Sequence, residues 1–143
     1  MVNLGLKLAR EVCVEYKEIL SQKDGYRLNV YAVERNSRSR VMESIDGLTQ
    51  DKKDEVINLL QKMAENGTEY KSPKVKWRLA KYSYGELKPH GHRFFFFVKV
   101  NENLILFDYE EKKKGSLKSD IYKRLQTEMK YYEREFERFI SGN

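Results

Sequence analysis

The segment HRFFFFVKVNENLILFDY, residues 92–109, decides the fold of this chain. Four consecutive phenylalanines and a later Leu-Ile-Leu-Phe run form two apolar stretches, and the residues between them, 100–103, are typical of a hairpin turn. A turn this short joins neighbouring strands in antiparallel orientation. The sequence therefore predicts an antiparallel meander, whose strands span Lys76–Tyr82, Tyr84–Lys88, Arg93–Val100 and Leu104–Tyr109.

Hydrophobic periodicity predicts the remaining elements. Apolar residues at every third or fourth position indicate amphipathic helices, whereas strict alternation indicates a half-buried strand. The two helices expected over residues 39–45 and 49–66 form a hairpin, and their apolar stripe must be buried against a sheet. We therefore expect the fold class to be α+β: a helical hairpin and a C-terminal helix packed on one antiparallel sheet of about four or five strands, with an extra N-terminal helix. The patterns place helices over residues 4–20, 39–45, 49–66 and 116–139, and a further strand over residues 26–34.

Composition limits the classes of partner and compartment. The chain has 28 Lys and Arg residues against 22 Asp and Glu, and the resulting net charge of +6 favours polyanions such as nucleic acid. A solvated, ion-paired surface would give the same count, so only clustering of the charges can separate the two interpretations. The single Cys13 and the two histidines predict no disulfide, no structural metal and no cofactor. No apolar stretch is long enough for a signal peptide, which predicts a cytoplasmic protein.

The positive charges do cluster along the meander. Between Lys71 and Lys99 there are eight Lys and Arg residues against one acid, Glu86. Because cations neutralise phosphates and aromatic rings stack on bases, single-stranded RNA matches this pattern best. The alternative is that the aromatic residues are core residues and that the lysine run is a solvated loop. The candidate RNA-binding residues are Lys76, Arg78, Lys81, Lys112, Lys113 and Lys114, with Trp77, Tyr82 and Tyr84 as the interleaved aromatics.

A family resemblance covers residues 26–133. The segments Val41–Leu48 and Glu55–Gly67, followed by YGELK at 84–88, HRFFFF at 92–97 and NLILF at 103–107, occur in an order that resembles the RelE/ParE toxin superfamily, nearest its HigB-like branch. A lysine knot, Lys112-Lys113-Lys114, and Asp120-Ile121 at the start of the last helix complete the resemblance. It divides the chain into an N-terminal helical extension, residues 1–25, and a toxin domain, residues 26–143.

The resemblance implies the toxin of a type II toxin–antitoxin pair, which enters the ribosomal A site and cleaves mRNA as a metal-independent endoribonuclease (an mRNA interferase). Its implied partners are a cognate antitoxin, the ribosome and mRNA, with no membrane and with a possible homodimer. Arg93 and Lys88 would stabilise the scissile phosphate, with Lys88 standing where the family usually has Arg. His92, or His90, and Tyr109 would transfer protons or stack on a base.

The resemblance also leaves two other functions open. Gly85 replaces the family's bulky residue before Glu86, and Leu117 stands where the family often has Pro. Three acids, Asp108, Glu110 and Glu111, adjoin the lysine knot and should repel phosphate. The chain could therefore be a catalytically silent protein that binds nucleic acid or a partner. The ParE-like branch, which inhibits DNA gyrase through protein contacts, is the third interpretation.

Overall fold

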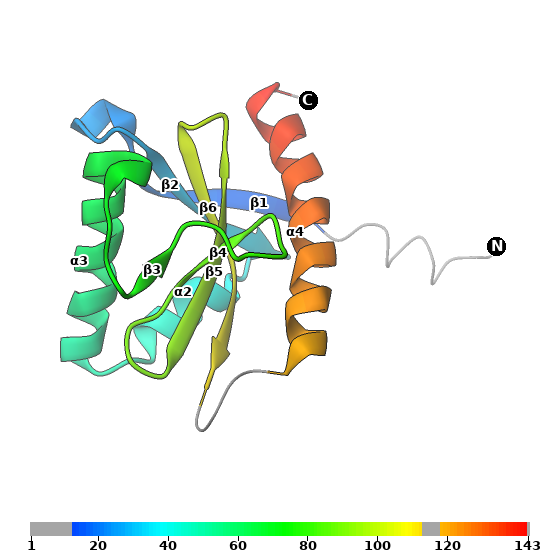
Figure 1. Cartoon of the computed structure of the whole chain (residues 1–143). Coiled ribbons are helices and arrows are strands. Elements are labelled where there is room, and N and C mark those ends of the chain that lie inside the picture. Colours follow the sequence, from blue (N-terminus) through cyan, green and yellow to red (C-terminus); the bar gives the residue numbers. More distant parts are fainter. Residues whose placement is uncertain (1–12, 113–117, 143) are drawn as a thin grey trace.

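The computed structural model describes residues 13–112 and 118–142. Within them, a six-stranded sheet runs in the order β1-β2-β6-β5-β4-β3 (Figure 1). The strands are β1 (Val14–Leu20), β2 (Asn29–Arg35), β3 (Val75–Lys76), β4 (Gly85–Leu87), β5 (His92–Lys99) and β6 (Asn103–Glu111). The helices are α2 (Arg40–Asp46), α3 (Gln50–Asn66) and α4 (Ser119–Ile140), with short 3-10 turns at η1 (Gln22–Asp24) and η2 (Gly67–Glu69).

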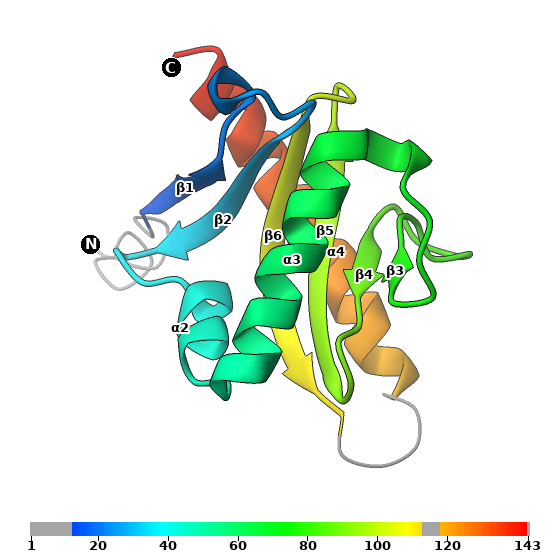
Figure 2. The ribbon, with the colours of Figure 1, turned by 90° about the vertical axis from the view of Figure 1, so that its left-hand side faces the viewer.

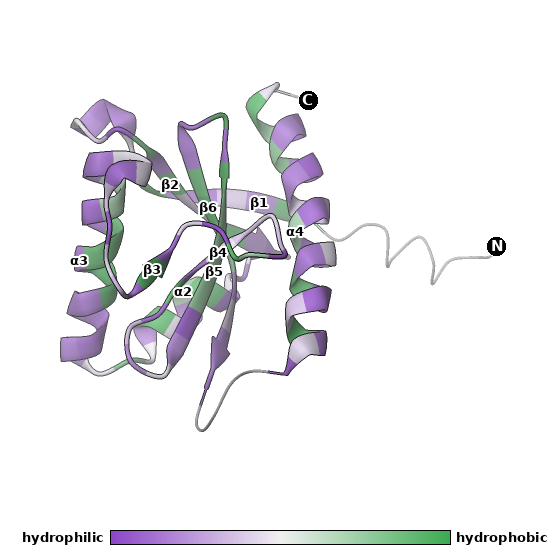
Figure 3. Ribbon diagram, in the orientation of Figure 1, coloured by the Kyte–Doolittle hydropathy of each residue, from purple (hydrophilic) through white to green (hydrophobic). Residues whose placement is uncertain are grey.

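Helices cover both faces of the sheet. Helix α3 lies across one face together with α2, whereas α4 lies on the opposite face, as the two perpendicular views show (Figures 1 and 2). The four phenylalanines of β5 alternate between these layers: Phe94 and Phe96 pack toward α3, and Phe95 and Phe97 pack toward α4. A strand that is buried on both faces needs apolar residues at every position, which explains the continuous run. The helices turn their hydrophobic sides toward the sheet (Figure 3).

The expected sheet of four or five antiparallel strands is wrong in number and in direction. The sheet has six strands and is mixed, because β2 runs parallel to β6 while its other neighbour β1 is antiparallel. The expected helical hairpin is also wrong as an arrangement. Helices occur near residues 39–45 and 49–66, but the short α2 packs mainly on β2 and β6 rather than along α3. In the described part of the chain no helix is long and apolar enough to cross a bilayer.

The expected N-terminal helix is wrong over the residues that the structure describes. Residues 14–20 form strand β1, which pairs with β2 from Val14↔Arg35 onward. An irregularity in the pairing between Glu18 and Leu20 shifts the alternation of the strand. Tyr16 consequently packs on the α4 side, whereas Ile19 and Leu20 pack on the α3 side. This interrupted alternation produces the three- and four-residue spacing that resembled a helix. Residues 4–12 of the expected helix lie outside the described residues.

Candidate functional site

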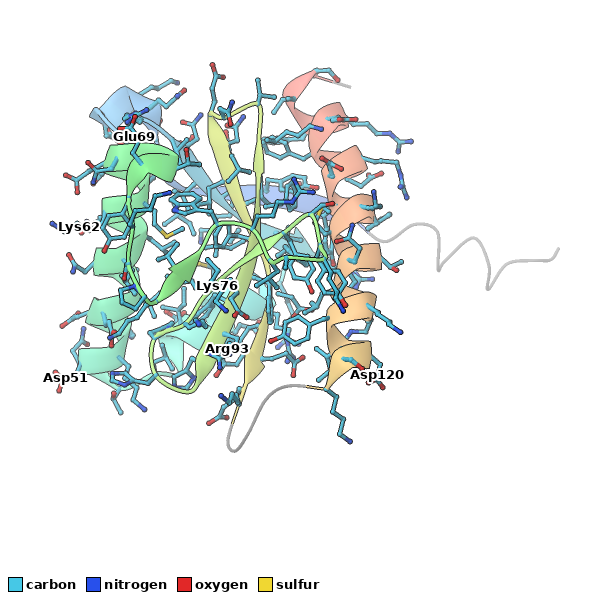
Figure 4. All side chains as sticks on the ribbon, viewed as in Figure 1. Asp51, Lys62, Glu69, Lys76, Arg93 and Asp120 are labelled. Atoms are coloured by element: carbon cyan, nitrogen blue, oxygen red, sulfur yellow. The ribbon has the colours of Figure 1, made fainter. Side chains whose placement is uncertain are left out.

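Strand pairing brings three of the predicted cations together on the α4 side of the sheet. Lys76 lies opposite Glu86 in the β3–β4 pair, and Leu87 lies opposite Phe94 in the β4–β5 pair. Since Leu87 packs toward α3 and side chains alternate along a strand, Glu86 and Lys88 face the α4 side, as does Arg93. Lys76 and Arg93 both lie near enough to Lys88 to affect its charge, and Figure 4 shows the two between α3 and α4. We call Lys76, Lys88 and Arg93 the cationic cluster.

Gly85 makes this arrangement possible. A Cβ atom at Gly85 would lie 2.3 Å from the carbonyl oxygen of Lys76 and 2.4 Å from that of Trp77, so only glycine lets the β3 backbone approach β4 this closely. The space that a larger side chain would need at position 85 is thus occupied by the backbone of Lys76 and Trp77. This close contact places Lys76 beside Glu86.

The charges of the cationic cluster are not compensated by ion pairs. Within residues 13–112 and 118–142, none of the ion pairs involves Lys76, Lys88 or Arg93. Burial, and next the neighbouring Lys76 ammonium, lower the pKa of Lys88, while the Glu86 carboxylate raises it. The cluster therefore holds like charges close enough to destabilise each other, and an anionic ligand would relieve that repulsion.

A buried carboxylate lies beside these cations. Glu86 is only 4% exposed, and its Oε1 atom is buried with no hydrogen-bond partner among the described residues. The Nε atom of Arg93 is likewise buried without a partner. Buried polar atoms are rarely left unpaired, because losing water without gaining a hydrogen bond costs about 1–3 kcal/mol. The site therefore has one hydrogen-bond acceptor without a partner, Oε1 of Glu86, and one donor without a partner, Nε of Arg93, next to the positive charges of the cationic cluster.

Helix α4 adds a phenol to the site. The pKa of Tyr122 is raised, first by burial and next by the nearby Glu86 carboxylate, with which its hydroxyl interacts. The hydroxyl of Tyr84 donates a hydrogen bond of 2.8 Å to the backbone carbonyl of Tyr122, which fixes the start of α4 over β4. Cations, a carboxylate and a phenol thus meet at one position. A ribose phosphate, which has both a hydroxyl donor and an anionic group, matches this set.

His92 and Tyr109 do not join this site. The Nδ1 atom of His92 lies 2.6 Å from the Tyr109 hydroxyl, and the two rings stack on the α3 side of the sheet, next to Phe94. His92 is 8% exposed, and burial followed by the charge of Lys52 lowers its pKa. The sheet therefore separates both groups from the cationic cluster. Proton transfer by His92 or Tyr109 stays a prediction, and it would have to take place on the α3 side of the sheet.

His90 is also directed elsewhere. Its Nε2 atom lies 3.0 Å from Oε1 of Glu55 on α3, and Lys74 pairs with the other oxygen of the same carboxylate. The pair fastens the β4–β5 turn to α3. His90 therefore helps to shape the turn that follows Lys88, without reaching the cationic cluster's face of the sheet.

The other predicted RNA-binding residues lie on the segment after β3, at the end of β6 or outside the described residues. The strand expected over residues 76–82 ends at Lys76, and an irregular segment follows it. Arg78 and Lys81 are exposed on that segment, where Nε of Arg78 donates to the carbonyl of Tyr82. Lys112 ends the first described range, and its N–H donates to the carbonyl of Gly91. Lys113 and Lys114 lie outside the described residues.

A second hollow lies on the β2–β6 side of α4. It has a volume of about 440 Å³, and its lining includes Arg40, Asp108 and Glu128. Its charges are largely paired internally, because Nε of Arg40 lies 3.0 Å from Oδ1 of Asp108 and Nε of Arg124 lies 3.1 Å from Oε2 of Glu128. The acids expected to repel phosphate are thus partly neutralised here. We place the candidate site at the cationic cluster, where the charges are unpaired.

Sequence reasoning missed Glu86 and Tyr122 as site residues. Glu86 carried a usable signal, since it is the one acid among eight cations between Lys71 and Lys99. Tyr122 carried none, because its position beside Glu86 depends on how α4 packs on the sheet. No protein-family model matches the chain, and a search of the curated proteins finds no match. The site must therefore be interpreted from its own chemistry.

Proposed function

We propose that this protein is an endoribonuclease that cleaves mRNA through attack of the ribose 2′-hydroxyl on the adjacent phosphate. One observation carries the proposal: the buried, unpartnered Oε1 atom of Glu86 beside the unpaired cationic cluster. RNA supplies a hydroxyl that can donate to this oxygen and a phosphate that can compensate the cations. DNA supplies only the phosphate, so the carboxylate favours RNA.

Glu86 acts as the general base in the proposed reaction. It accepts the proton of the 2′-hydroxyl while that oxygen forms a bond to phosphorus. Lys88, Arg93 and Lys76 stabilise the additional negative charge on the phosphate oxygens as the bond forms. Arg93 contributes most, because a guanidinium contacts two oxygens at once.

Tyr122 acts as the general acid. Its raised pKa keeps the phenol protonated until the bond from phosphorus to the 5′-oxygen breaks, and it then donates its proton to that oxygen. The products are a 2′,3′-cyclic phosphate and a free 5′-hydroxyl. The proton gained by Glu86 returns to Tyr122, with which it interacts, and the site is reset. These steps require no metal ion.

The biological setting of the proposal comes from the family resemblance of residues 26–133. We propose that the chain is a HigB-like toxin of the RelE/ParE superfamily, active in the cytoplasm on ribosome-bound mRNA and neutralised by a cognate antitoxin. The exposed Arg78 and Lys81, on the segment that follows Lys76, support an extended contact with RNA phosphates.

Cell-free translation with mapping of mRNA 5′ ends tests the proposal. Addition of the protein should inhibit translation and create new 5′ ends, and Arg93→Ala should reduce their rate of appearance by roughly 10²–10³-fold. Arg138→Ala is a matched control, because this exposed arginine near the end of α4 pairs only with Glu135 in the described chain. Equal cleavage by Arg93→Ala and the unaltered protein would contradict the proposal. RNA binding without new ends would favour a silent binder, and inhibition of gyrase would favour the ParE-like interpretation.

A further inference from the structure

The segment that connects β3 to β4 is held firmly against α4. The N–H of Ser83 donates to Oε1 of Gln126 at 2.9 Å, and the side-chain amide of Gln126 donates back to Oγ of Ser83 at 3.3 Å. Within the segment, the N–H of Tyr82 donates to the carbonyl of Leu79. These hydrogen bonds therefore fix the position of the segment, which begins directly after Lys76 of the cationic cluster.

Trp77, Tyr82 and Tyr84 lie in or next to this segment and were candidates for stacking on bases. The structure gives each of them a different environment. Trp77 packs against Phe96 and donates its indole N–H to the carbonyl of Tyr70, so it serves the α3 side of the core. Tyr84 is fully buried. Tyr82 is only partly buried, and among the described residues its hydroxyl forms no hydrogen bond.

The ring of Tyr82 lies next to the ring of Tyr122, the general acid of the proposed reaction. Its ring centroid is 6.2 Å from that of Tyr122, and the two rings are inclined by 18°. The hydroxyl of Tyr122 interacts with Glu86, which lies beside the cationic cluster. A nucleotide bound with its scissile phosphate at Tyr122 would therefore have the ring of Tyr82 as a neighbour.

We propose that the exposed part of Tyr82 contacts the base of a nucleotide that flanks the scissile phosphate, and so positions that phosphate on the cationic cluster. This inference rests on the proposed function and adds a substrate-positioning residue to it. Aromatic contact with a base is typically sequence-tolerant, whereas the unpaired hydroxyl of Tyr82 can discriminate between donor and acceptor groups of a base. Tyr82 is a positioning residue, since the reacting atoms lie at Glu86, Arg93 and Tyr122.

Cleavage of mRNA on ribosomes with a vacant A site tests this inference, with single abasic nucleotides placed on either side of the cleaved bond. We expect one abasic position to slow single-turnover cleavage by the unaltered protein roughly tenfold. Tyr82→Leu should slow cleavage of intact RNA to a similar extent and should show no further loss on that abasic RNA. Tyr82→Phe should retain most of the rate, because it keeps the ring.

The outcomes separate this inference from the proposed function. Normal cleavage of all abasic RNAs by the unaltered protein would overturn the role of Tyr82 even if Tyr82→Leu folded poorly, because that measurement uses no variant. Fully additive losses in Tyr82→Leu and abasic RNA would also overturn it, since they would show that the two groups do not interact. If Arg93→Ala loses activity while Tyr82→Leu does not, the proposed function stands and this inference fails. A protein that cleaves no RNA would overturn both.

Discussion

Replacement of Glu86 by glutamine should change RNA binding and RNA cleavage in opposite directions. The substitution keeps the shape of the side chain and removes one negative charge from a buried position beside Lys76, Lys88 and Arg93. A bound phosphate would then meet the full charge of the cationic cluster. The same change removes the group that we propose as the acceptor of the 2′-hydroxyl proton.

The magnitudes follow from the charges. Two unit charges about 6 Å apart, at an effective dielectric constant of about 20, repel each other by roughly 3 kcal/mol before salt screening. Counter-ions and partial exposure of the bound RNA reduce this value, so we expect Glu86→Gln to bind RNA several-fold more tightly at low salt. Loss of a general base typically slows the chemical step by about 10²–10⁴-fold. The two effects differ in sign, which a general loss of structure could not produce.

Two assays measure these effects separately. Fluorescence anisotropy with a labelled RNA that carries 2′-deoxyribose at the cleaved position reports binding without turnover. Single-turnover cleavage of ribosome-bound mRNA reports the chemical step. Glu69→Gln removes the same charge from an exposed residue of η2 that is far from Arg93 (Figure 4), and both assays should match the unaltered protein. Unchanged cleavage by Glu86→Gln, or weaker binding, would refute the role assigned to Glu86.

Three further substitutions test the geometry and the charges of the site. Gly85→Ala should destabilise the fold by about 1–3 kcal/mol in denaturant titration and reduce cleavage, because its methyl group would clash with the backbone of β3. Gly47→Ala is the control: the nearest atom to its methyl group would lie 3.5 Å away, so neither stability nor cleavage should change. RNA affinity should fall as the pH rises toward 10.5, because the pKa of Lys88 is lowered and the side chain loses its charge. Lys88→Arg should flatten this pH profile, because arginine stays charged. A flat profile for the unaltered protein would contradict the role of Lys88 in RNA binding. Burial, followed by contact with Asp108, raises the pKa of Glu128 to about 7, so its contribution to stability is present below the usual carboxyl value and is lost as the pH rises through 7. The melting temperature should accordingly fall between about pH 5 and pH 8, and Glu128→Gln should abolish that fall.

The local elements of this fold could be predicted from the sequence, but their assembly could not. The phenylalanine run and the turn at residues 100–103 defined β5 and β6 because alternation and turn chemistry are encoded in adjacent residues. The parallel pairing of β2 with β6 joins segments about seventy residues apart, and nothing local specifies it. Strand β1 was misassigned because its shift near Glu18 breaks the alternation on which the assignment depends.

The candidate site divides in the same way. Charge clustering identified Lys76, Lys88 and Arg93, because consecutive strands of a sheet place their residues near one another. The sequence analysis placed both Arg93 and His92 in one site, but neighbouring residues of a strand take opposite faces of the sheet. Sequence alone does not fix which face each takes, because Phe94 to Phe97 are apolar on both faces of β5.

The chemistry of the RNA ends tests the central claim most directly. mRNA cleaved on the ribosome should yield an upstream fragment with a 2′,3′-cyclic phosphate and a downstream fragment with a 5′-hydroxyl, both identified by mass spectrometry. A single 2′-deoxyribose at the cleaved position should abolish the reaction, because Glu86 would have no hydroxyl to activate. Fragments that carry a 3′-hydroxyl and a 5′-phosphate, or unchanged cleavage of the 2′-deoxy substrate, would contradict the account.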